Sequence, residues 1–356
     1  MAPPTSPAPK ATPLLDHVVI LVPHAFLASP PAWLRAPFRF APGGRHADGR
    51  TENALVLLAD GSYLEFIAFV PAASAGGGSS RHEHRWGRKA EGTVIDWALT
   101  LHAPGDDDGS GDEIRHGAEF RDIQDRVGKA AADAGFAYGD PVRGGRLRPD
   151  GAELRWAVAS ARRRREGKGE GHTDAAASAS TPGPEPDGAS WAPVEPGQLP
   201  FWCLDETPRR LRVPFEEDGG DKTRHPTGIV GVAEVEVVVA GGGGGDGDGL
   251  GKEKEALAAA YDAVFGEKGG RDGWEVETVA GGRKAGRLLH PPGRIVLSAA
   301  RAQEGGGSGD GAGAGAGGSI KITFYTDDEN WVGKTIGGKV DGEHTLEFKL
   351  VAATPK

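Results

Sequence analysis

Apolar residues in the first part of the chain are grouped into short runs separated by turn-forming residues. The runs Leu14–Val22, Ala54–Leu58 and Tyr63–Phe69 have the length and the content of β-branched and aromatic residues that predict β-strands. An Asp-Gly pair between the second and third runs predicts a hairpin turn. Ser29-Pro30 predicts the start of a short helix, because serine caps helices and proline is tolerated in their first turn. With Phe38–Ala41 as a further strand, this unit has the order strand, helix and three strands.

The same order of elements recurs twice, with weaker patterns. In the second unit, a strand over Thr93–Leu101 precedes apolar residues at helical spacing from Phe120 to Ala134, and Gly135 follows as a stop signal. The remaining strands of the second unit are predicted at Phe136–Tyr138, Glu153–Ala159 and Leu199–Leu204. The third unit is predicted to contain a strand at Gly228–Val239, a helix along Leu257–Val264, strands at Trp274–Val279, Arg294–Ala299 and Ile320–Thr326, and a last strand at Glu343–Leu350.

We therefore predict an α+β fold, in which paired βαβββ modules form curved mixed sheets around a cleft, with a third partial module. Glycine tracts lose too much backbone entropy on folding to form packed elements, so we expect them as surface loops. The predicted segments are a disordered leader at 1–13, a domain at 14–210 with modules 14–70 and 93–205 and a low-complexity insert 162–190, and a third module at 225–351 with Gly-rich inserts 241–249 and 305–318.

Composition limits the classes of partner. The chain has 356 residues and a formal net charge of −10, whereas nucleic-acid binders are typically basic. No apolar run approaches the roughly 18 residues of a membrane span, and a single cysteine, Cys203, cannot form a disulfide within the chain. We expect a cytoplasmic protein that binds a small molecule, with no nucleic-acid and no membrane partner. Composition leaves the oligomeric state open.

Two ionisable residues lie inside the apolar strands of the first unit, His17 in the first strand and Glu65 in the last. An ionisable side chain in an apolar strand is costly without a partner. An imidazole and a carboxylate are half of a typical divalent metal site. Without a metal, the same pair can act as a general base and its orienting partner. The alternative is a structural hydrogen bond between a buried imidazole and a buried carboxylate.

A polar loop precedes and begins the second strand pair of the first unit. Its backbone amides can face an anion, and its side chains can donate hydrogen bonds to substrate oxygens. The donors that we single out are Arg45, His46, Thr51 and Asn53. The alternative is a solvated loop with a β-turn.

Several motifs along the chain resemble those of a known family. They are Leu15-Asp16-His17-Val18-Val19, Gly43-Gly44-Arg45-His46, the segment from Gly49 to Leu55, Tyr63-Leu64-Glu65, Ile95-Asp96-Trp97, Arg148 to Gly151 with Trp156, Pro200-Phe201, and His225 to Gly228. Together they are similar to the glyoxalase-like domain family of the vicinal oxygen chelate superfamily, from about Leu14 to about Val239. The resemblance implies paired βαβββ modules, in which residues on the first and last strands of each module hold a divalent metal that chelates vicinal oxygens of a substrate.

The resemblance places His17 and Glu65 at the ligand positions of the first module. In the second module, Asp96 lies opposite His17 and Phe201 opposite Glu65, and a phenyl ring cannot ligate a metal. The resemblance thus implies one divalent ion, with His17 and Glu65 as its ligands. Candidates for a third ligand are Asp96, His102, Cys203 and Asp205.

Three functions fit these observations. The first is an enzyme of the lyase, isomerase or dioxygenase type that acts on a small oxygen-rich molecule, with His17 and Glu65 as its catalytic residues. The residues expected to contact the substrate are Arg45, His46, Thr51, Asn53, Asp96 and Trp156. The second is a non-catalytic module that binds or sequesters a small molecule. The third is an interaction protein in which the Gly-rich loops are the functional part.

Overall fold

The computed structural model describes residues 12–71, 81–101, 117–130, 135–148, 150–165, 190–240, 247–281, 283–284, 287–300 and 318–353. The predicted leader, except for residues 12 and 13, lies outside these ranges, as does His102. The same holds for residues 166–189, 241–246 and 305–317 of the predicted inserts. Residues 162–164 and 247–249 were predicted to belong to inserts, but they form part of a strand and the first turn of a helix.

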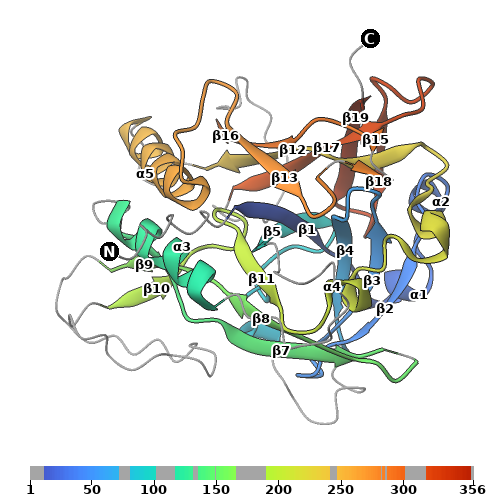
Figure 1. The fold of residues 1–356 in the computed structure, drawn as a ribbon, viewed down its shortest axis with the longest axis horizontal. Helices are drawn as coiled ribbons and strands as arrows, with labels where there is room; N and C mark the ends of the chain where they lie inside the picture. Colours follow the sequence, from blue (N-terminus) through green and yellow to red (C-terminus); the bar gives the residue numbers. More distant parts are fainter. Residues whose placement is uncertain are drawn as a thin grey trace, which may run out of the picture.

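The first module has the predicted order of elements (Figure 1). Strand β1 pairs in parallel with β4, which pairs antiparallel with β3, and β3 pairs antiparallel with β2. The single helix predicted at Ser29 is two short helices, because Ser29 ends the first and Pro31 precedes the second. The elements are β1 (Pro13–Leu21), α1 (His24–Ala28), α2 (Ala32–Arg35), β2 (Ala41–Arg45), β3 (Thr51–Leu57) and β4 (Tyr63–Phe69).

The second module repeats this pairing, with β5 parallel to β11, β11 antiparallel to β8, and β8 antiparallel to β7. The predicted strand Phe136–Tyr138 exists as β6, but it joins β9 and β10 in a separate small sheet. The strand beside β8 is β7, which the sequence did not predict. The elements are β5 (Thr93–Leu101), α3 (Gly117–Ala130), β6 (Phe136–Tyr138), β7 (Val142–Leu147), β8 (Glu153–Ala159), β9 (Ala161–Arg164), β10 (Trp191–Pro193) and β11 (Phe201–Asp205).

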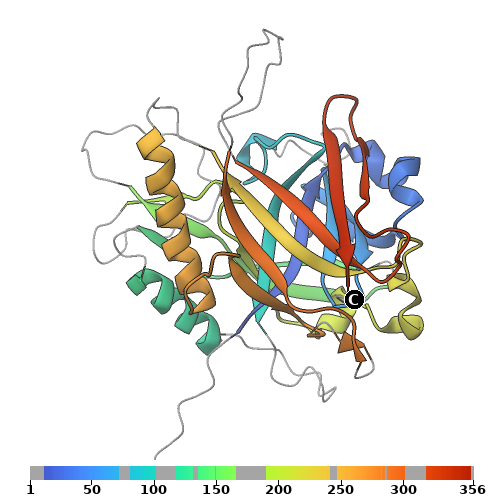
Figure 2. The ribbon, with the colours of Figure 1, turned by 90° about the horizontal axis from the view of Figure 1, so that it is seen from above.

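The two modules join through their first strands, because β1 and β5 pair antiparallel. The joined strands run in the order β2-β3-β4-β1-β5-β11-β8-β7, and an isolated bridge between His46 and Arg146 brings the two outer strands together. The sheet thereby curves into a barrel (Figures 1 and 2). Its interior, which we call the inner face, is lined by an apolar cluster of Val19, Leu21, Ile67, Trp86, Ile95, Ala98, Leu154, Trp156, Phe201 and Cys203.

The C-terminal part differs from the third βαβββ module that we predicted. Here β12 is parallel to β16 and β17 is parallel to β19, while β12 and β17 pair antiparallel with each other. The predicted strand Ile320–Thr326 therefore begins a second, shorter unit instead of ending the third module. The elements are β12 (Ile229–Val239), α5 (Gly247–Phe265), β13 (Trp274–Thr278), β14 (Arg283–Lys284), β15 (Arg287–Leu288), β16 (Gly293–Ala299), β17 (Ser319–Thr326), β18 (Thr335–Lys339) and β19 (Thr345–Ala352).

The two parts of the molecule share one large core. Strand β13 pairs with the start of β1, which joins the described main-sheet strands into a single 14-stranded sheet. Helices α3 and α5 lie side by side against it (Figure 2), and Arg126 donates to the carbonyls of Ala263 and Val264 at the end of α5. Among the described helices, none has both the length and the apolar character needed to span a bilayer.

Candidate functional site

A β-bulge at Asp16 sets the geometry of the first strand. The register of β1 against β5 passes from Leu15 directly to His17, so Asp16 is an extra residue in the strand. Successive side chains of a regular strand point to opposite faces, but a bulge redirects them. As a result, the Asp16 carboxylate reaches the neighbouring imidazole, with 2.7 Å between Oδ2 and His17 Nδ1. Both side chains are buried.

The structure brings His17 and Glu65 together on the inner face. Strands β1 and β4 are parallel, with His17 opposite Tyr63 and Val19 opposite Glu65. The distance from His17 Nε2 to Glu65 Oε2 is 3.5 Å. The Tyr63 ring stacks on the imidazole with centroids 4.6 Å apart, and Phe201 meets it edge-on at 5.3 Å. The imidazole is therefore fixed between two carboxylates and two aromatic rings.

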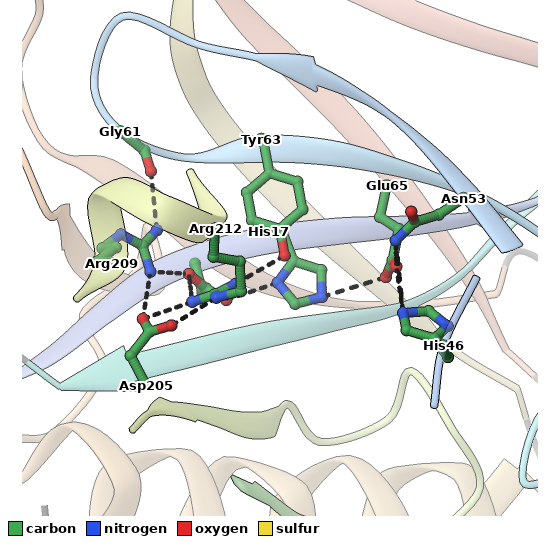
Figure 3. Close-up of polar contacts among 10 residues, drawn as sticks. His17, His46, Asn53, Gly61, Tyr63, Glu65, Asp205, Arg209 and Arg212 are labelled. Carbon is green, nitrogen blue, oxygen red and sulfur yellow. Dashed lines mark hydrogen bonds and ion pairs between the residues drawn. The ribbon is translucent and has the colours of Figure 1, made fainter. Parts of the chain in front are cut away.

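Two of the predicted polar-loop residues, Asn53 and His46, contact Glu65, and a third, Thr51, contacts His46. Asn53 donates from Nδ2 to Glu65 Oε1 at 2.6 Å, and its own Oδ1 accepts from the amide of Gly44. His46 Nε2 lies 3.7 Å from Glu65 Oε1, while its Nδ1 is 2.7 Å from the Thr51 hydroxyl. Burial lowers the pKa of His46, although the charge of Glu65 acts against this. Figure 3 shows these side chains as one line of contacts that continues through His17.

Arg45 does not join this group. Its guanidinium pairs with Glu52 at 3.1 Å, and Glu52 also contacts His24 of α1. Because Asn53 faces the inside of the barrel, its neighbour Glu52 faces outward, and so does its cross-strand partner Arg45. Arg45 was predicted to bind substrate, and the structure places it on the opposite face of the sheet.

Asp16 belongs to a buried network of charged side chains on the side away from Glu65 (Figure 3). Arg209 and Arg212 of the short helix α4 (Arg209–Arg212) both donate to Asp16, and Arg212 also binds Asp205 through two parallel hydrogen bonds of 2.6 and 2.7 Å. Arg212 donates to the Tyr63 hydroxyl as well. Burial alone would raise the pKa of Asp16, but the two guanidinium charges outweigh it and hold this pKa well below its usual range. Asp16 is thus a fixed anion behind the imidazole.

In the second module, the residue that corresponds to His17 is Asp96, and its carboxylate is already bonded to protein donors. The Asp96 carboxylate accepts hydrogen bonds from Arg85, the Trp86 indole and the amide of Gly197, at 2.7, 2.8 and 3.1 Å. The Arg85 guanidinium also lies 4.8 Å above the Phe201 ring. Burial raises the pKa of Asp96, and these donors act against the rise. Asp96 was predicted to contact substrate, but its oxygens are occupied by the protein.

Trp156 lies on β8, in the inner-face cluster, where its ring meets His46 edge-on with centroids 6.0 Å apart. Most of the group is buried, but 19% of the His46 side chain is exposed, against 4% for His17. Solvent therefore reaches these residues from the side of His46 and Trp156.

Comparison with models of protein families shows the family of this chain. A family model described as a glyoxalase-like domain matches residues 15–242, which is more than half of the chain. The chain belongs to the glyoxalase-like domain family. This family is part of the vicinal oxygen chelate superfamily, and its match spans both described modules and β12.

Other comparisons of this glyoxalase-like protein add little. Comparison with curated proteins gives no match. Among solved structures it is similar to a hypothetical protein from Staphylococcus aureus, with 10% identity over 95% of this chain and 100% of the other, and a TM-score of 0.48. A similarity at this level carries no argument about activity.

The residues of this glyoxalase-like domain do not fit the four-ligand metal site of the superfamily. His17 and Glu65 occupy two ligand positions, but Phe201 occupies the fourth, and the oxygens of Asp96 are already bonded. Among the other candidates, burial raises the pKa of the Cys203 thiol well above its usual value, and Asp205 is bound by Arg212. The described ranges contain no group of three or more His, Cys, Asp or Glu residues arranged to hold a metal ion.

Four structural features of the barrel were not predicted from the sequence. They are the paired arginines of α4, the Arg85–Trp86 cover over the second module, strand β7, and Arg146 on that strand. Arg209 and Arg212 carry the one usable signal, since two basic residues at helical i, i+3 spacing follow directly after an apolar strand that ends in Asp205.

Proposed function

We propose that this protein binds a small oxygen-rich molecule on the inner face, and that Glu65 and His17 transfer a proton to and from it. The observation that carries the proposal is the contact of His17 Nε2 with Glu65 at 3.5 Å, behind which Asp16 holds Nδ1 at 2.7 Å. An isolated structural pair would not need a second carboxylate that two arginines keep charged.

The tautomer of His17 explains how the pair can work. Asp16 remains ionised next to two arginines, so it accepts the Nδ1 proton of the imidazole. Nε2 is then the ring position that faces Glu65, and a proton between these two atoms can reside on either one. Asn53 fixes the other oxygen of Glu65. This is the arrangement of a general base with an orienting partner.

The corresponding reaction class is proton abstraction next to a carbonyl group. Glu65 would take the proton from the carbon, and the imidazolium of His17 would return one to the developing oxyanion or to the adjacent carbon. Isomerase and lyase chemistry both begin with this step. Dioxygenase chemistry depends on a metal, and the donor set described above is incomplete for one, so we derive no step through a metal ion.

A non-catalytic binding protein is the second candidate. It is favoured by the second module, where Arg85 and Trp86 cover Asp96 and Phe201 replaces a ligand. In that case the inner face would hold a small molecule without changing it, and Glu65 and His46 would serve as hydrogen-bonding groups.

Solvent exchange separates the two candidates without knowledge of the product. A panel of small hydroxycarbonyl and dicarbonyl compounds is incubated with the protein in D2O, and loss of the α-proton signal is followed by NMR. We expect exchange with the unmodified protein and a loss of about 10²-fold or more with Glu65→Gln. Glu347→Gln, an exposed glutamate on β19, is the matched control and should exchange at the original rate.

Two results would contradict the catalytic proposal. One is exchange that survives Glu65→Gln. The other is a thermal shift on addition of a panel compound with no exchange at all, which would favour the binding protein.

A further inference from the structure

The side chain of Arg146 lies on the inner face of the barrel, near the residues that contact Glu65. On β7 it lies directly opposite Leu154 of β8, and Gly144 lies opposite Trp156. Directly opposed residues of antiparallel strands share a face, and both Leu154 and Trp156 belong to the inner-face cluster. The bridge between His46 and Arg146 then brings this arginine next to β2, where His46 is 3.7 Å from Glu65.

The guanidinium of Arg146 is buried and forms no ion pair with a described residue. The residue is 6% exposed, and Nη1 donates to the Gly43 carbonyl at 2.5 Å. Within the described ranges, no carboxylate lies within 4 Å of it. The other buried arginines of the barrel, Arg209 and Arg212, are both paired with Asp16 and Asp205. A buried cation is stable only with a partner, and a guanidinium has five donors, of which most remain for a ligand.

We propose that Arg146 binds a carboxylate of the small molecule that the inner face accepts. This rests on the proposed function and narrows it to small 2-oxo or 2-hydroxy carboxylic acids. A guanidinium matches a carboxylate through two parallel hydrogen bonds. With the carboxylate on Arg146, the carbon that loses its proton lies toward His46 and Glu65; it is C2 in a 2-hydroxy acid and C3 in a 2-oxo acid.

Charge favours a carboxylate over a phosphate. Asp16 and Asp205 balance Arg209 and Arg212, and Asp96 pairs with Arg85, so among the described cations around the inner face Arg146 is the one that forms no ion pair. A monoanion adds one negative charge, whereas a phosphate dianion would add a second charge with no partner in a low-dielectric interior.

The test compares acids with their neutral isosteres. Binding of lactate and pyruvate to the full-length protein is measured by isothermal titration calorimetry beside lactamide and pyruvamide, which keep the same skeleton without the charge. We expect the acids to bind at least about tenfold more tightly than the amides. Arg146→Gln should remove this preference, while Arg143→Gln, an exposed arginine on the same strand, should keep it.

A second variant and a second probe keep the test decisive. Arg146→Lys retains the positive charge but not the paired N–H donors of the guanidinium, so we expect an intermediate preference for the acids. If Arg146→Gln does not fold, Arg146→Lys takes its place in the comparison. Equal binding of acids and amides by the unmodified protein would overturn the assignment. Retention of the preference in Arg146→Gln would overturn it as well, and so would tighter binding of inorganic phosphate than of lactate.

The two proposals fail in different ways. If Arg146-dependent carboxylate binding occurs without proton exchange, the ligand assignment stands and the catalytic proposal fails. If a neutral carbonyl compound exchanges its proton through Glu65 and Arg146→Gln exchanges it equally fast, the catalytic proposal stands and the ligand assignment fails.

Discussion

The two βαβββ modules have the same strand order, but different side chains occupy their equivalent positions on the inner face. The β1–β5 register pairs His17 with Ala98 and Asp96 with Val19, so His17 and Asp96 occupy equivalent positions under exchange of the two strands. In the first module this position holds an imidazole whose Nε2 faces a carboxylate at 3.5 Å. In the second it holds a carboxylate that is fully bonded to the protein, beside a phenylalanine.

This difference shows how a duplicated fold can divide its roles. Equivalent backbone positions offer two sites, but the 81–89 segment inserts Arg85 and Trp86 over one of them. Phe201 and Trp156 of the second module line the inner face beside the residues of the first. In the function that we propose, the second module contributes Arg146 to the ligand from β7, at the edge of the sheet.

The largest effect on stability is expected from disrupting the buried ion pairs of Arg212 with Asp16 and Asp205. Arg212→Met removes the cation that binds both Asp16 and Asp205 and leaves buried carboxylates underpaired. We expect the free energy of unfolding to fall by about 4 kcal/mol, measured by urea denaturation. Arg210→Met alters an exposed arginine of the same helix and should leave stability unchanged. Equal losses in both variants would contradict the network.

The cover of the second module is expected to matter nearly as much. Asp96→Asn takes the charge from a buried acceptor and sets an amide NH2 against the donors of Arg85 or Trp86. We expect a loss of about 3 kcal/mol in the free energy of unfolding. Asp125→Asn on α3, which is exposed, is the control. A nearly unchanged free energy of unfolding in Asp96→Asn would show that the hydrogen bonds to Asp96 do not stabilise the fold.

Acid should weaken the tie between the first module and the C-terminal part. His225 donates from Nε2 to the Leu57 carbonyl and accepts the Arg39 amide at Nδ1, so it is neutral. Burial lowers the pKa of His225 to about 4. The unfolded chain takes up this proton first as the pH falls, so the stabilisation is present above about pH 6.5 and is lost toward pH 4.

The loss attributable to His225 is about 3 kcal/mol between pH 7 and pH 4. Urea unfolding at several pH values measures it as the difference in slope between the unmodified protein and His225→Gln. Parallel slopes in the two proteins would show that His225 does not titrate in this range.

The smallest effect on stability is expected at Glu65. In Glu65→Gln the side-chain oxygen still accepts from Asn53, and the amide donates to His17 Nε2 in place of the shared proton. We expect the free energy of unfolding to change by less than about 1 kcal/mol, while proton exchange is lost. A large destabilisation would instead make Glu65 a structural counterpart of Asp96.

The sequence predicted the first module best because its strands carry apolar runs bounded by clear turns. The period-two alternation of strands allowed His17 and Glu65 to share a face. Their contact also depends on the parallel register of β1 and β4, which the spacing does not fix. The C-terminal units were harder, since β18 (Thr335–Lys339) has two glycines and little apolar pattern. Its absence from the prediction merged two short units into one module.

The candidate site was incomplete for a similar reason. Strand β7 (Val142–Leu147) contains two glycines and two arginines, so neither alternation nor β-propensity marks it, and Arg146 was missed with it. Arg209 and Arg212 act on Asp16, which lies 193 and 196 residues away in the sequence. Arg85 and Trp86 reach Asp96 from a segment of turns, whose path no periodic pattern predicts. Arg45 was grouped with its neighbour His46 as a substrate donor, but adjacent residues at a strand end point to opposite faces, so Arg45 pairs with Glu52 outside the barrel.

The contact between Asp16 and His17 depends on the backbone, because the extra residue in the strand directs the Asp16 carboxylate to the imidazole. A relative that kept His17 and Glu65 but had a regular first strand would send its aspartate to the outside of the barrel, and the imidazole would lose its anchor. Inheritance of this site therefore requires an insertion to be preserved as well as side chains. A designer who grafts the pair onto another barrel has to copy the kinked strand with it.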